Sequence, residues 1–248
     1  MGDVSLVSLD DEFRFYTPTD PAGDYLELKW IFREVFEEDM YRAMFAEVPP
    51  DGVVLDVGAN VGLFTLLLKR ERPNAVVHAF EPAPDCVEAL RRNVDLQGLS
   101  DVTVHPVGIG AEGRSSVPFT YYPRASGNST RYPEQKKNYG HGLLKESSTI
   151  EVEVQTLSAV LARCPELARI DLLKIDVEGA EEDVLLGLAE ADWKKVNALV
   201  IEVEDLDGRL GRIESLLAAQ GFSTTREYVP MVPKEHRLFI VRATRPPA

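Results

Sequence analysis

The sequence predicts an α/β protein in which helices cover a mostly parallel β-sheet. Apart from residues 115–142, short apolar runs alternate with longer segments of helical periodicity, which is the pattern of a doubly wound sheet. The run "VVLDV" at 53–57 is apolar and rich in valine, as expected for a strand that is buried on both faces. It leads through the turn "GANVG" at 58–62 into a helix-like segment, so strand, turn and helix follow in the order that such a sheet requires.

The first 50 residues are predicted to form a helical extension ahead of the sheet. In "DYLELKWIFREVFEEDMYRAMF", Tyr25, Leu28, Phe32 and Phe36 recur at three- and four-residue spacing, which predicts an amphipathic helix. An apolar stripe of this kind usually packs against a core, but it can also belong to a lid, so both interpretations stay open. Residues 51–248 are predicted to form one main domain, because the chain is too short for two full-sized domains to be the default.

Six strands and the helices between them are predicted in the main domain. The strands are expected at 53–57, 75–80, 102–107, 170–175, 198–203 and 237–242, and two of the helices at 85–96 and 181–189. Pro82 and Pro84 come just before the first of these helices, where proline ends a strand and begins a helix without losing a needed hydrogen bond.

Residues 115–155 are predicted to form an insert in this domain. The stretch 121–148 is rich in Tyr, Pro, Ser, Gly, Asn and Lys, lacks a sustained period, and is longer than the usual connections in a compact domain. The flanking segments "SSVPFTYY" and "STIEVEV" resemble strands, so we expect a long hairpin arm. Long connections of this kind are usually functional or disordered.

The turn at 58–62 has the features of a ligand-binding turn. Gly58 and Gly62 lack a Cβ where the backbone turns sharply, which lets a ligand approach the chain closely. The unpaired N–H groups at the start of the next helix suit a carboxylate or a phosphate. Glycine is also common in strand-to-helix turns that bind nothing, so the glycines alone leave both interpretations open.

Two acids extend this pattern. Glu81 ends the next buried strand, "VVHAFEP", where it can accept hydrogen bonds from both hydroxyls of a ribose. Asp56 at the end of the first strand would repel a pyrophosphate, but it could accept a hydrogen bond from an ammonium group. The order of glycines also differs from the G-x-G-x-x-G of dinucleotide-binding folds. A ligand with an ammonium group, a carboxylate and a ribose is an amino-acid nucleoside.

A third group of polar residues lies in "IDLLKIDVEGAEEDVL". Lys174 and Asp176 interrupt an apolar strand at alternate positions, so they share one face, and Asp176 falls at the carboxyl end, where open α/β sheets bind ligands. In "ALVIEVED", Glu202 lies near the tip of a further strand. Alternatively, Lys174 and Asp176 form a buried ion pair that has no catalytic role. Glu204 and Asp205 are interpreted as part of a solvent-exposed face.

Composition and charge restrict the class of protein. The formal net charge of −14 disfavours a nucleic-acid partner, because binding to phosphates requires clustered Lys and Arg. No apolar stretch approaches the roughly 20 residues that span a bilayer, and "MGDVSLVSLDDEF" lacks the features of a signal peptide, so we expect a cytoplasmic protein without a membrane partner. Cys86 and Cys164 are too few and too isolated to indicate a disulfide framework or a zinc site.

The strings "LDVGANVG", "AFEP" and "DLLKIDVEGAE" occur in this order, and together they resemble the FkbM-type methyltransferases that depend on S-adenosylmethionine. The resemblance implies a Rossmann-like class I methyltransferase fold, with a seven-stranded, mostly parallel sheet whose last strand is antiparallel. It also implies transfer of a methyl group to a hydroxyl oxygen. The segments "FREVFEEDMY" and "FTYYPRAS" look like the members that act in polyketide and nonribosomal peptide pathways, on a small-molecule or acyl-carrier-bound substrate.

The resemblance also assigns cofactor-binding residues, position by position. The glycine turn and its preceding acid are expected around the methionine part, the second strand tip at the ribose, and the residues after the third strand at the adenine. In chain order these residues are Asp56, Gly58, Asn60, Gly62, Glu81, Pro82, Val107 and Gly108.

Methyl transfer to a hydroxyl needs a base near the carboxyl edge of the sheet, since the sulfonium already activates the methyl group. Asp176 is the first candidate, and Glu202, His105, His141 and His236 are the others. A magnesium ion held by Asp176 and Glu202 could instead lower the pKa of the substrate hydroxyl. The metal-free route is favoured, because the chain offers no tight acidic cluster at ligand spacing.

Two other functional classes stay open. An NAD-dependent oxidoreductase would share the glycine turn and the ribose acid, but the glycine spacing argues against it. A noncatalytic adaptor that binds S-adenosylmethionine would keep the fold without turnover, and the presence of Asp56, Glu81 and Asp176 speaks against it. The residues define neither an oligomeric state nor the identity of the methyl acceptor.

Overall fold

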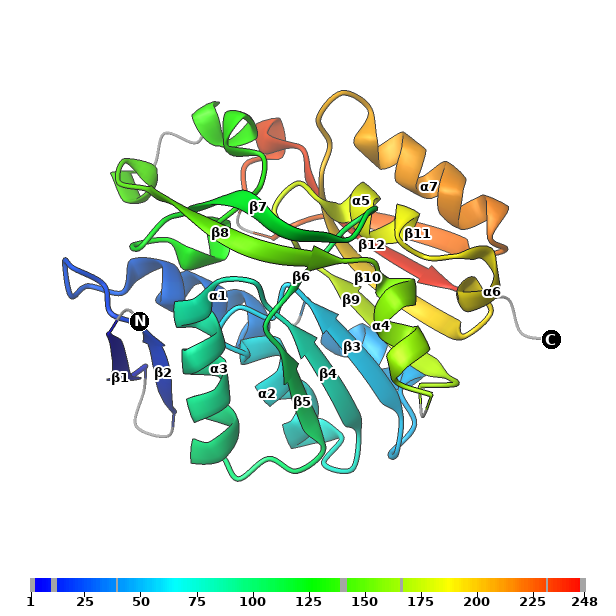
Figure 1. Ribbon diagram of the computed structural model, residues 1–248, viewed down its shortest axis with the longest axis horizontal. Helices are drawn as coiled ribbons and strands as arrows, with labels where there is room; N and C mark the ends of the chain where they lie inside the picture. Colours follow the sequence, from blue (N-terminus) through cyan, green and yellow to red (C-terminus); the bar gives the residue numbers. More distant parts are fainter. Residues whose placement is uncertain are drawn as a thin grey trace.

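The computed structural model describes residues 3–9, 13–38, 40–138, 142–165, 167–230 and 232–245. Its centre is a seven-stranded sheet with the order β11-β12-β10-β9-β3-β4-β5 (Figure 1). The strands are β3 (Val53–Val57), β4 (Val76–Phe80), β5 (Val102–His105), β9 (Ile170–Ile175), β10 (Val196–Glu204), β11 (Ser223–Tyr228) and β12 (Leu238–Thr244). The pairings from β5 to β10 are parallel, whereas β12 is antiparallel to both of its neighbours. The predicted fold class is therefore confirmed, including its antiparallel last strand.

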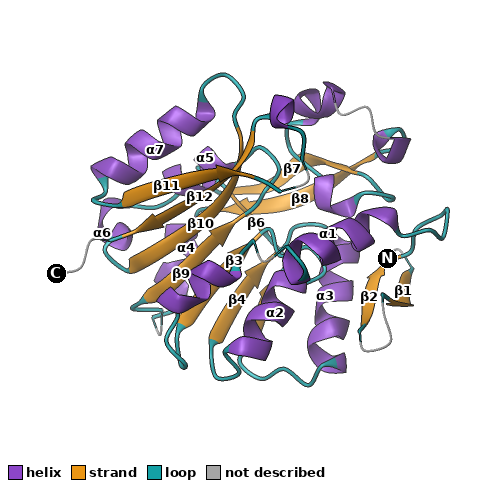
Figure 2. Ribbon diagram, turned by 180° about the vertical axis from the view of Figure 1, so that it is seen from behind, coloured by secondary structure: helices purple, strands orange, loops and turns teal. Residues whose placement is uncertain are grey.

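The sheet is buried on both faces, because alternate side chains of each strand enter two separate apolar cores. Val54 and Leu172 belong to one core, and their neighbours Leu55 and Leu173 belong to the other. The first core includes side chains of α1 (Leu26–Phe36), the 3-10 helix η1 (Arg42–Glu47) and α2 (Leu63–Glu71), and Figure 2 shows α3 (Pro84–Leu96) on the same side. The second core includes side chains of α4 (Leu157–Arg163), α5 (Glu181–Leu186), α6 (Glu190–Trp193) and α7 (Arg209–Ala219). Among the residues that the structure describes, no helix is long and apolar enough to cross a membrane.

The N-terminal region contains a β-hairpin that the sequence pattern does not predict. Its strands β1 (Val4–Ser8) and β2 (Arg14–Pro18) pair antiparallel. The fully buried Asn93 of α3 holds the hairpin: its Oδ1 accepts a hydrogen bond from Tyr16 N at 2.6 Å, and its Nδ2 donates to Tyr16 O and to Val61 O, both at 2.8 Å. One side chain therefore connects the hairpin, α3 and the segment after β3.

Helix α1 confirms the predicted amphipathic helix. The rings of Phe32 and Phe36 stack with their centroids 4.8 Å apart, and both meet Phe13 and Phe15 of the hairpin. The apolar stripe thus packs on the hairpin and the first core, as such stripes usually do.

The insert forms a second, smaller sheet with the order β6-β8-β7. Strands β7 (Arg114–Tyr121) and β8 (Ser148–Gln155) pair antiparallel, which confirms the expected hairpin arm, and the short β6 (Gly108–Ile109) adds a parallel third strand. The described part of the connection contains three short 3-10 helices: η2 (Ser126–Asn128), η3 (Pro133–Asn138) and η4 (Gly142–Leu144). Figures 1 and 2 show this sheet beyond the carboxyl ends of the parallel strands.

Strand β11 is absent from the six predicted strands, and its position explains why. It pairs only with β12 at the edge of the sheet, and five of its six residues are exposed. An edge strand with polar side chains carries no apolar alternation, so the sequence pattern does not indicate it.

The contacts of Asn93 predict a stability effect. Asn93→Ala leaves Tyr16 N, Tyr16 O and Val61 O without this partner, so the free energy of unfolding should fall by about 1–3 kcal/mol. Gln97→Ala is the control, because Gln97 is exposed at the end of the same helix and donates one 3.3 Å hydrogen bond to Arg14 O. Its cost should stay below about 0.5 kcal/mol. Equal decreases in the free energy of unfolding of the two variants, measured by urea denaturation, would contradict this role of Asn93.

Candidate active site

A cavity of about 520 Å³ lies at the carboxyl edge of the central sheet, enclosed by α1 and the insert. It is lined by nine of the candidate site residues, which lie near the carboxyl ends of β3, β4, β5, β9 and β10 or just before β12. They are Gly58, Asn60, Glu81, Pro82, Val107, Gly108, Asp176, Glu202 and His236. Asp56 and Gly62 lie next to this lining but outside it, and His141 lies outside the described residues.

His105 does not belong to the cavity lining. Its Nε2 lies 2.9 Å from His78 Nδ1, and its ring stacks on Phe80 with the centroids 4.5 Å apart. Burial lowers the pKa of His105 to about 4. These contacts give it a packing role on β5.

The two glycines of the turn are required by close packing. Gly58 has a φ of +82°, and a Cβ there would lie 1.7 Å from the carbonyl oxygen of Asp176. Gly62 has a φ of +91°, and a Cβ there would lie 2.4 Å from Leu90 Cδ1. Any side chain at either position would collide, so the turn passes directly against the loop after β9 and against α3.

Asn60 has the geometry of a ligand-binding residue. It lies between the two glycines in the left-handed region, with a φ of +48°. Its side-chain Oδ1 is buried and has no hydrogen-bond partner within the described part of the chain. A buried acceptor without a partner is unfavourable, so the position suits a donor group on a bound molecule.

Glu81 lies at the tip of β4, where backbone N–H groups fix its carboxylate. One oxygen accepts from Asn60 N at 2.9 Å, and the other accepts from Ala83 N at 2.8 Å. The side chain lines the cavity and is otherwise buried, which raises its pKa to about 7. Each carboxylate oxygen keeps a further lone pair for a ligand hydroxyl.

Lys174 is the centre of a buried group of charges. Its Nζ donates to Gly58 O at 2.8 Å and lies 3.2 Å from Asp56 Oδ1 and 3.3 Å from Asp176 Oδ2. Burial disfavours the charge of Lys174, but the attraction of the two carboxylates outweighs it, and the net effect raises its pKa. The buried ion pair that the sequence left open is therefore present.

The two aspartates bound by Lys174 have different surroundings. Asp56 is fully buried, and its other oxygen accepts a hydrogen bond from the Thr65 hydroxyl at 2.7 Å, so Asp56 lies behind Lys174 as seen from the cavity. The side chain of Asp176 is 29% exposed and lines the cavity. Asp176 is thus the member of this group that a bound molecule can reach.

Further acids surround Asp176, and two of them, Glu34 and Glu178, are not indicated by the sequence. Glu34 of α1 lines the cavity with Glu178 and Glu202, and the buried Tyr41 lies beside them. Burial, reinforced by repulsion from Asp176, raises the pKa of Glu34 to about 7 and that of Glu202 well above its ordinary range. Neither Glu34 nor Tyr41 has a signal in the sequence, because the apolar stripe of α1 shows only which face packs. In the described ranges, no three His, Cys, Asp or Glu side chains are arranged to hold a metal ion.

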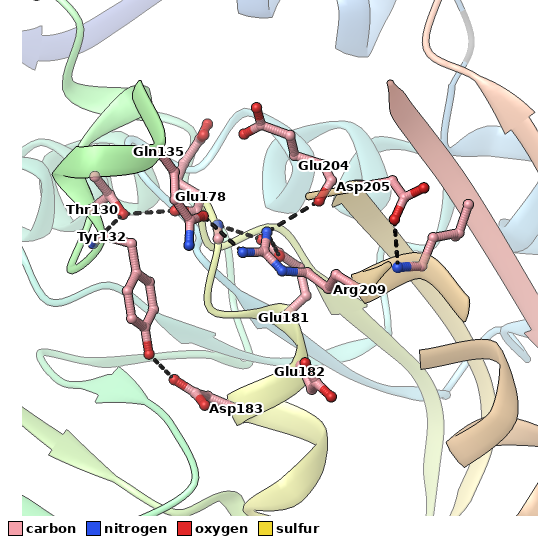
Figure 3. Close-up of polar contacts among 12 residues, drawn as sticks. Thr130, Tyr132, Gln135, Glu178, Glu181, Glu182, Asp183, Glu204, Asp205 and Arg209 are labelled. Atoms are coloured by element: carbon pink, nitrogen blue, oxygen red, sulfur yellow. Dashed lines mark hydrogen bonds and ion pairs between the residues drawn. The ribbon is translucent and has the colours of Figure 1, made fainter. Parts of the chain in front are cut away.

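A polar network joins the insert to the loop after β9 (Figure 3). Thr130 Oγ1 donates to Glu178 O at 2.7 Å, and Arg209 Nη2 donates to Gln135 Oε1 at 2.7 Å. Arg209 Nη1 also lies 3.2 Å from Glu181 Oε2, and both side chains are buried. The insert is therefore fastened to the segment that begins with Asp176.

Glu204 and Asp205 correct one expectation, because they are not a solvent-exposed face. Both are buried, with 7% and 8% of their surface exposed. Glu204 lies 3.8 Å from Lys136 of the insert, whose Nζ also pairs with Glu178, and Asp205 pairs with Arg237. Glu204 ends β10 and contacts Lys136 of the insert, whereas Asp205 follows the strand and contacts Arg237 just before β12.

The other side of the insert is attached to α1. Glu27 accepts hydrogen bonds from Gly127 N at 3.1 Å and from Asn128 Nδ2 at 2.9 Å. Arg124 pairs with Asp20 at 3.2 Å and with Asp24 at 2.9 Å. Helix α1 and the insert thus form one continuous cover over the cavity.

These features define a Rossmann-like methyltransferase, and comparisons with known proteins agree. TYW2 from M. jannaschii, solved in complex with AdoMet, matches 99% of this chain and 88% of its own with a TM-score of 0.50 at 12% identity, which shows the fold. Residues 56–224 match the family model of the Methyltransferase FkbM domain, so the chain belongs to the FkbM methyltransferase family.

Two relatives of known name are similar over most of the chain. Methyltransferase 1 of Beauveria bassiana is 36% identical over 98% of both chains. The 31-O-demethyl-FK506 methyltransferase FkbM of Streptomyces tacrolimicus is 34% identical over 83% of this chain and 85% of its own. The suspected resemblance is therefore confirmed, and the family does not favour an oxidoreductase or a noncatalytic adaptor.

The buried Glu81 and Glu181 and the half-buried Glu27 and Glu34 predict a pH dependence of stability. Burial raises the pKa of Glu27, Glu34, Glu81 and Glu181 from 4.5 to about 7. Such a carboxyl binds its proton more tightly in the folded state than in the unfolded chain, so its stabilising effect is complete below pH 4.5 and is lost as the pH rises through 7. His105 has the opposite sign, but its lowered pKa acts only below about pH 6.5.

We therefore expect the free energy of unfolding to fall by about 1–3 kcal/mol between about pH 6.5 and about pH 8.5 in urea denaturation. Glu34→Gln, which cannot ionise, should weaken this dependence. Glu37→Gln should leave it unchanged, because the side chain of Glu37 is 60% exposed on the same helix. Stability that rises over this pH interval would contradict the assignment.

Proposed function

We propose that this protein is an S-adenosylmethionine-dependent O-methyltransferase that acts on a hydroxyl of a small-molecule or carrier-bound natural-product intermediate. The observation that carries the proposal is the cavity, which joins an end suited to an amino-acid nucleoside with an end where Asp176 is accessible. Family membership supports methyl transfer. The printed name of the Streptomyces relative refers to a methylated oxygen, and the TYW2 structure contains AdoMet, which supports the cofactor.

The residues at the first end fit S-adenosylmethionine. The Glu81 carboxylate can accept from both ribose hydroxyls, and the orphaned Oδ1 of Asn60 can accept from the ammonium group. Gly58 brings the backbone close to the methionine part, and Val107 and Gly108 provide a wall for the adenine. The bound cofactor would supply a methyl group that its sulfonium already activates. Asp56 acts indirectly, by holding Lys174.

Asp176 is the base that the geometry favours. Lys174 fixes its carboxylate at 3.3 Å, and the backbone N–H of Asp176 donates to Val57 O at 3.0 Å, so the side chain is held at the cavity wall. An acceptor hydroxyl between Asp176 and the methyl group would transfer its proton to the carboxylate as the new carbon–oxygen bond forms and the carbon–sulfur bond breaks. Glu202 and His236 line the same end and are the alternatives.

A metal-free reaction is the simpler of two routes. Asp176 already has a cation within contact distance, Lys174, and needs no metal to orient it. A magnesium ion bound by Asp176 and Glu202 would be the other route, since oxygen ligands suit this ion. The chelator arm of the next experiment separates them.

Asp176→Asn keeps the shape of the side chain but removes the base, so single-turnover methyl transfer should slow by about 10²–10⁴-fold. Methyl transfer is measured from labelled S-adenosylmethionine to a panel of hydroxylated macrolactones, cyclohexanols and glycosides, with mass spectrometry to locate the methyl group on oxygen. The affinity for S-adenosylhomocysteine, measured by calorimetry, should change by less than about twofold. Asp207→Asn, on an exposed loop, is the matched control.

Several outcomes decide between the interpretations. EDTA should leave the wild-type rate unchanged if the route is metal-free, whereas a loss that magnesium restores would establish the metal route. An Asp176→Asn protein that binds S-adenosylhomocysteine and reacts at the wild-type rate would move the base to Glu202 or His236. Cofactor binding without any methylated product would favour the adaptor.

A further inference from the structure

The cavity has a second end whose polar groups the cofactor does not use. The cofactor residues proposed above lie at the tips of β3 and β4 and after β5. The other end combines Asp176 and Glu202 with Glu34 and Tyr41, which come from the N-terminal region. Three of these four groups, Glu34, Tyr41 and Glu202, have no hydrogen-bond partner in the described part of the chain.

Tyr41 is the first of them. Its side chain is buried with 4% of its surface exposed, and its ring packs edge-on against Phe64 with the centroids 5.1 Å apart. No residue among those described accepts or donates a hydrogen bond at its hydroxyl, which borders the cavity. Because it borders the cavity, this hydroxyl is available to a group on a bound molecule.

Glu34 and Glu202 are the other two. Both line the cavity, and neither has a hydrogen bond or an ion pair with the described residues. Repulsion from Asp176 acts on both carboxyls, and repulsion from Glu34 also acts on Glu202. Neither nearby lysine pairs with Glu34 or Glu202, because Lys174 contacts Asp56 and Asp176, and Lys136 contacts Glu178.

Acids gathered beside one another oppose folding where they are ionised, and among these three only Asp176 is in direct contact with Lys174. The Tyr41 hydroxyl borders them without a partner among the described residues. A ligand that provides hydrogen bonds relieves both. The groups available are the phenol O–H of Tyr41, the carboxylate of Asp176, which accepts, and the carboxyls of Glu34 and Glu202, whose raised pKa values let them donate as well as accept. An uncharged hydroxyl compound fits this set, whereas an anionic group would be repelled.

We propose that Glu34 and Tyr41 complete an acceptor subsite with Asp176 and Glu202, and that this subsite takes an uncharged hydroxyl-bearing group and excludes anionic ones. The inference rests on the proposed methyltransferase function. Tyr41 donates to the acceptor oxygen while a carboxylate accepts the hydroxyl proton, so the oxygen is held with a lone pair free toward the methyl group. Trp30, one turn before Glu34 and 52% exposed, lines the rim and offers an aromatic surface to the apolar part of the acceptor.

Sinefungin tests this proposal without knowledge of the natural acceptor. It matches S-adenosylhomocysteine but carries an amine where the transferable methyl group would lie, so its ammonium reaches into the acceptor subsite. We expect wild-type protein to bind sinefungin about tenfold or more tightly than S-adenosylhomocysteine in calorimetry, because of charge-assisted hydrogen bonds to the carboxylates.

Two variants and two matched controls assign that preference. Glu34→Gln should reduce it by about tenfold and Tyr41→Phe by about threefold, while the affinity for S-adenosylhomocysteine stays unchanged and reports intact folding. Glu37→Gln, exposed on the same helix, and Tyr16→Phe, outside the cavity, should keep the wild-type preference.

The outcomes are distinguishable. If both compounds bind equally, or if Glu34→Gln and Tyr41→Phe keep the full preference for sinefungin, the subsite assignment is wrong while the proposed cofactor stands. If wild-type protein binds neither compound, the proposed function itself fails, and the subsite fails with it.

Discussion

The buried contact between Lys174 and three oxygens is the interaction on which the rest of the site depends. Its partners are Asp56 on β3, the carbonyl of Gly58 in the next turn, and Asp176 after β9. Removing one partner of a buried ion pair costs several kcal/mol, because it leaves an uncompensated charge. Lys174 therefore fixes three segments in one arrangement, and the position of Asp176 at the cavity wall is set by β3 as much as by its own strand.

The insert and α1 cover the cavity on two sides of the loop after β9, and the acids on these two sides differ in whether a cation lies beside them. On the insert side, Lys136 contacts Glu178 and Glu204, and Arg209 contacts Glu181, so each of these acids has a cation beside it. On the α1 side, Glu34 faces the cavity without a cation. An acidic wall of this kind suits the proposed reaction, in which a cationic methyl donor meets a neutral hydroxyl and a proton is released.

The sequence predicts the parts of the site that consist of adjacent residues. The valine run, the glycine turn and Glu81 could be recognised because a buried strand, a tight turn and a strand-tip acid each have a local signature, and the structure places Gly58, Asn60 and Glu81 at one cavity. The hairpin of β1 and β2 and the edge strand β11 lack such a signature. Their strands are short and contain polar residues, so no continuous apolar run marks them. The burial of Glu204 and Asp205 could not be predicted, since it depends on which distant segments cover them. Glu34 and Tyr41 were missed for the same reason.

The most direct test of the proposed cofactor site is a crystal structure of the protein with S-adenosylhomocysteine. We expect the ribose hydroxyls within hydrogen-bond distance of Glu81 and the ammonium group at Asn60. The sulfur atom should be directed toward Asp176 and Tyr41, and the contacts of Lys174 should be unchanged. A ligand bound outside this cavity, or one with its sulfur atom directed away from Asp176, would contradict it.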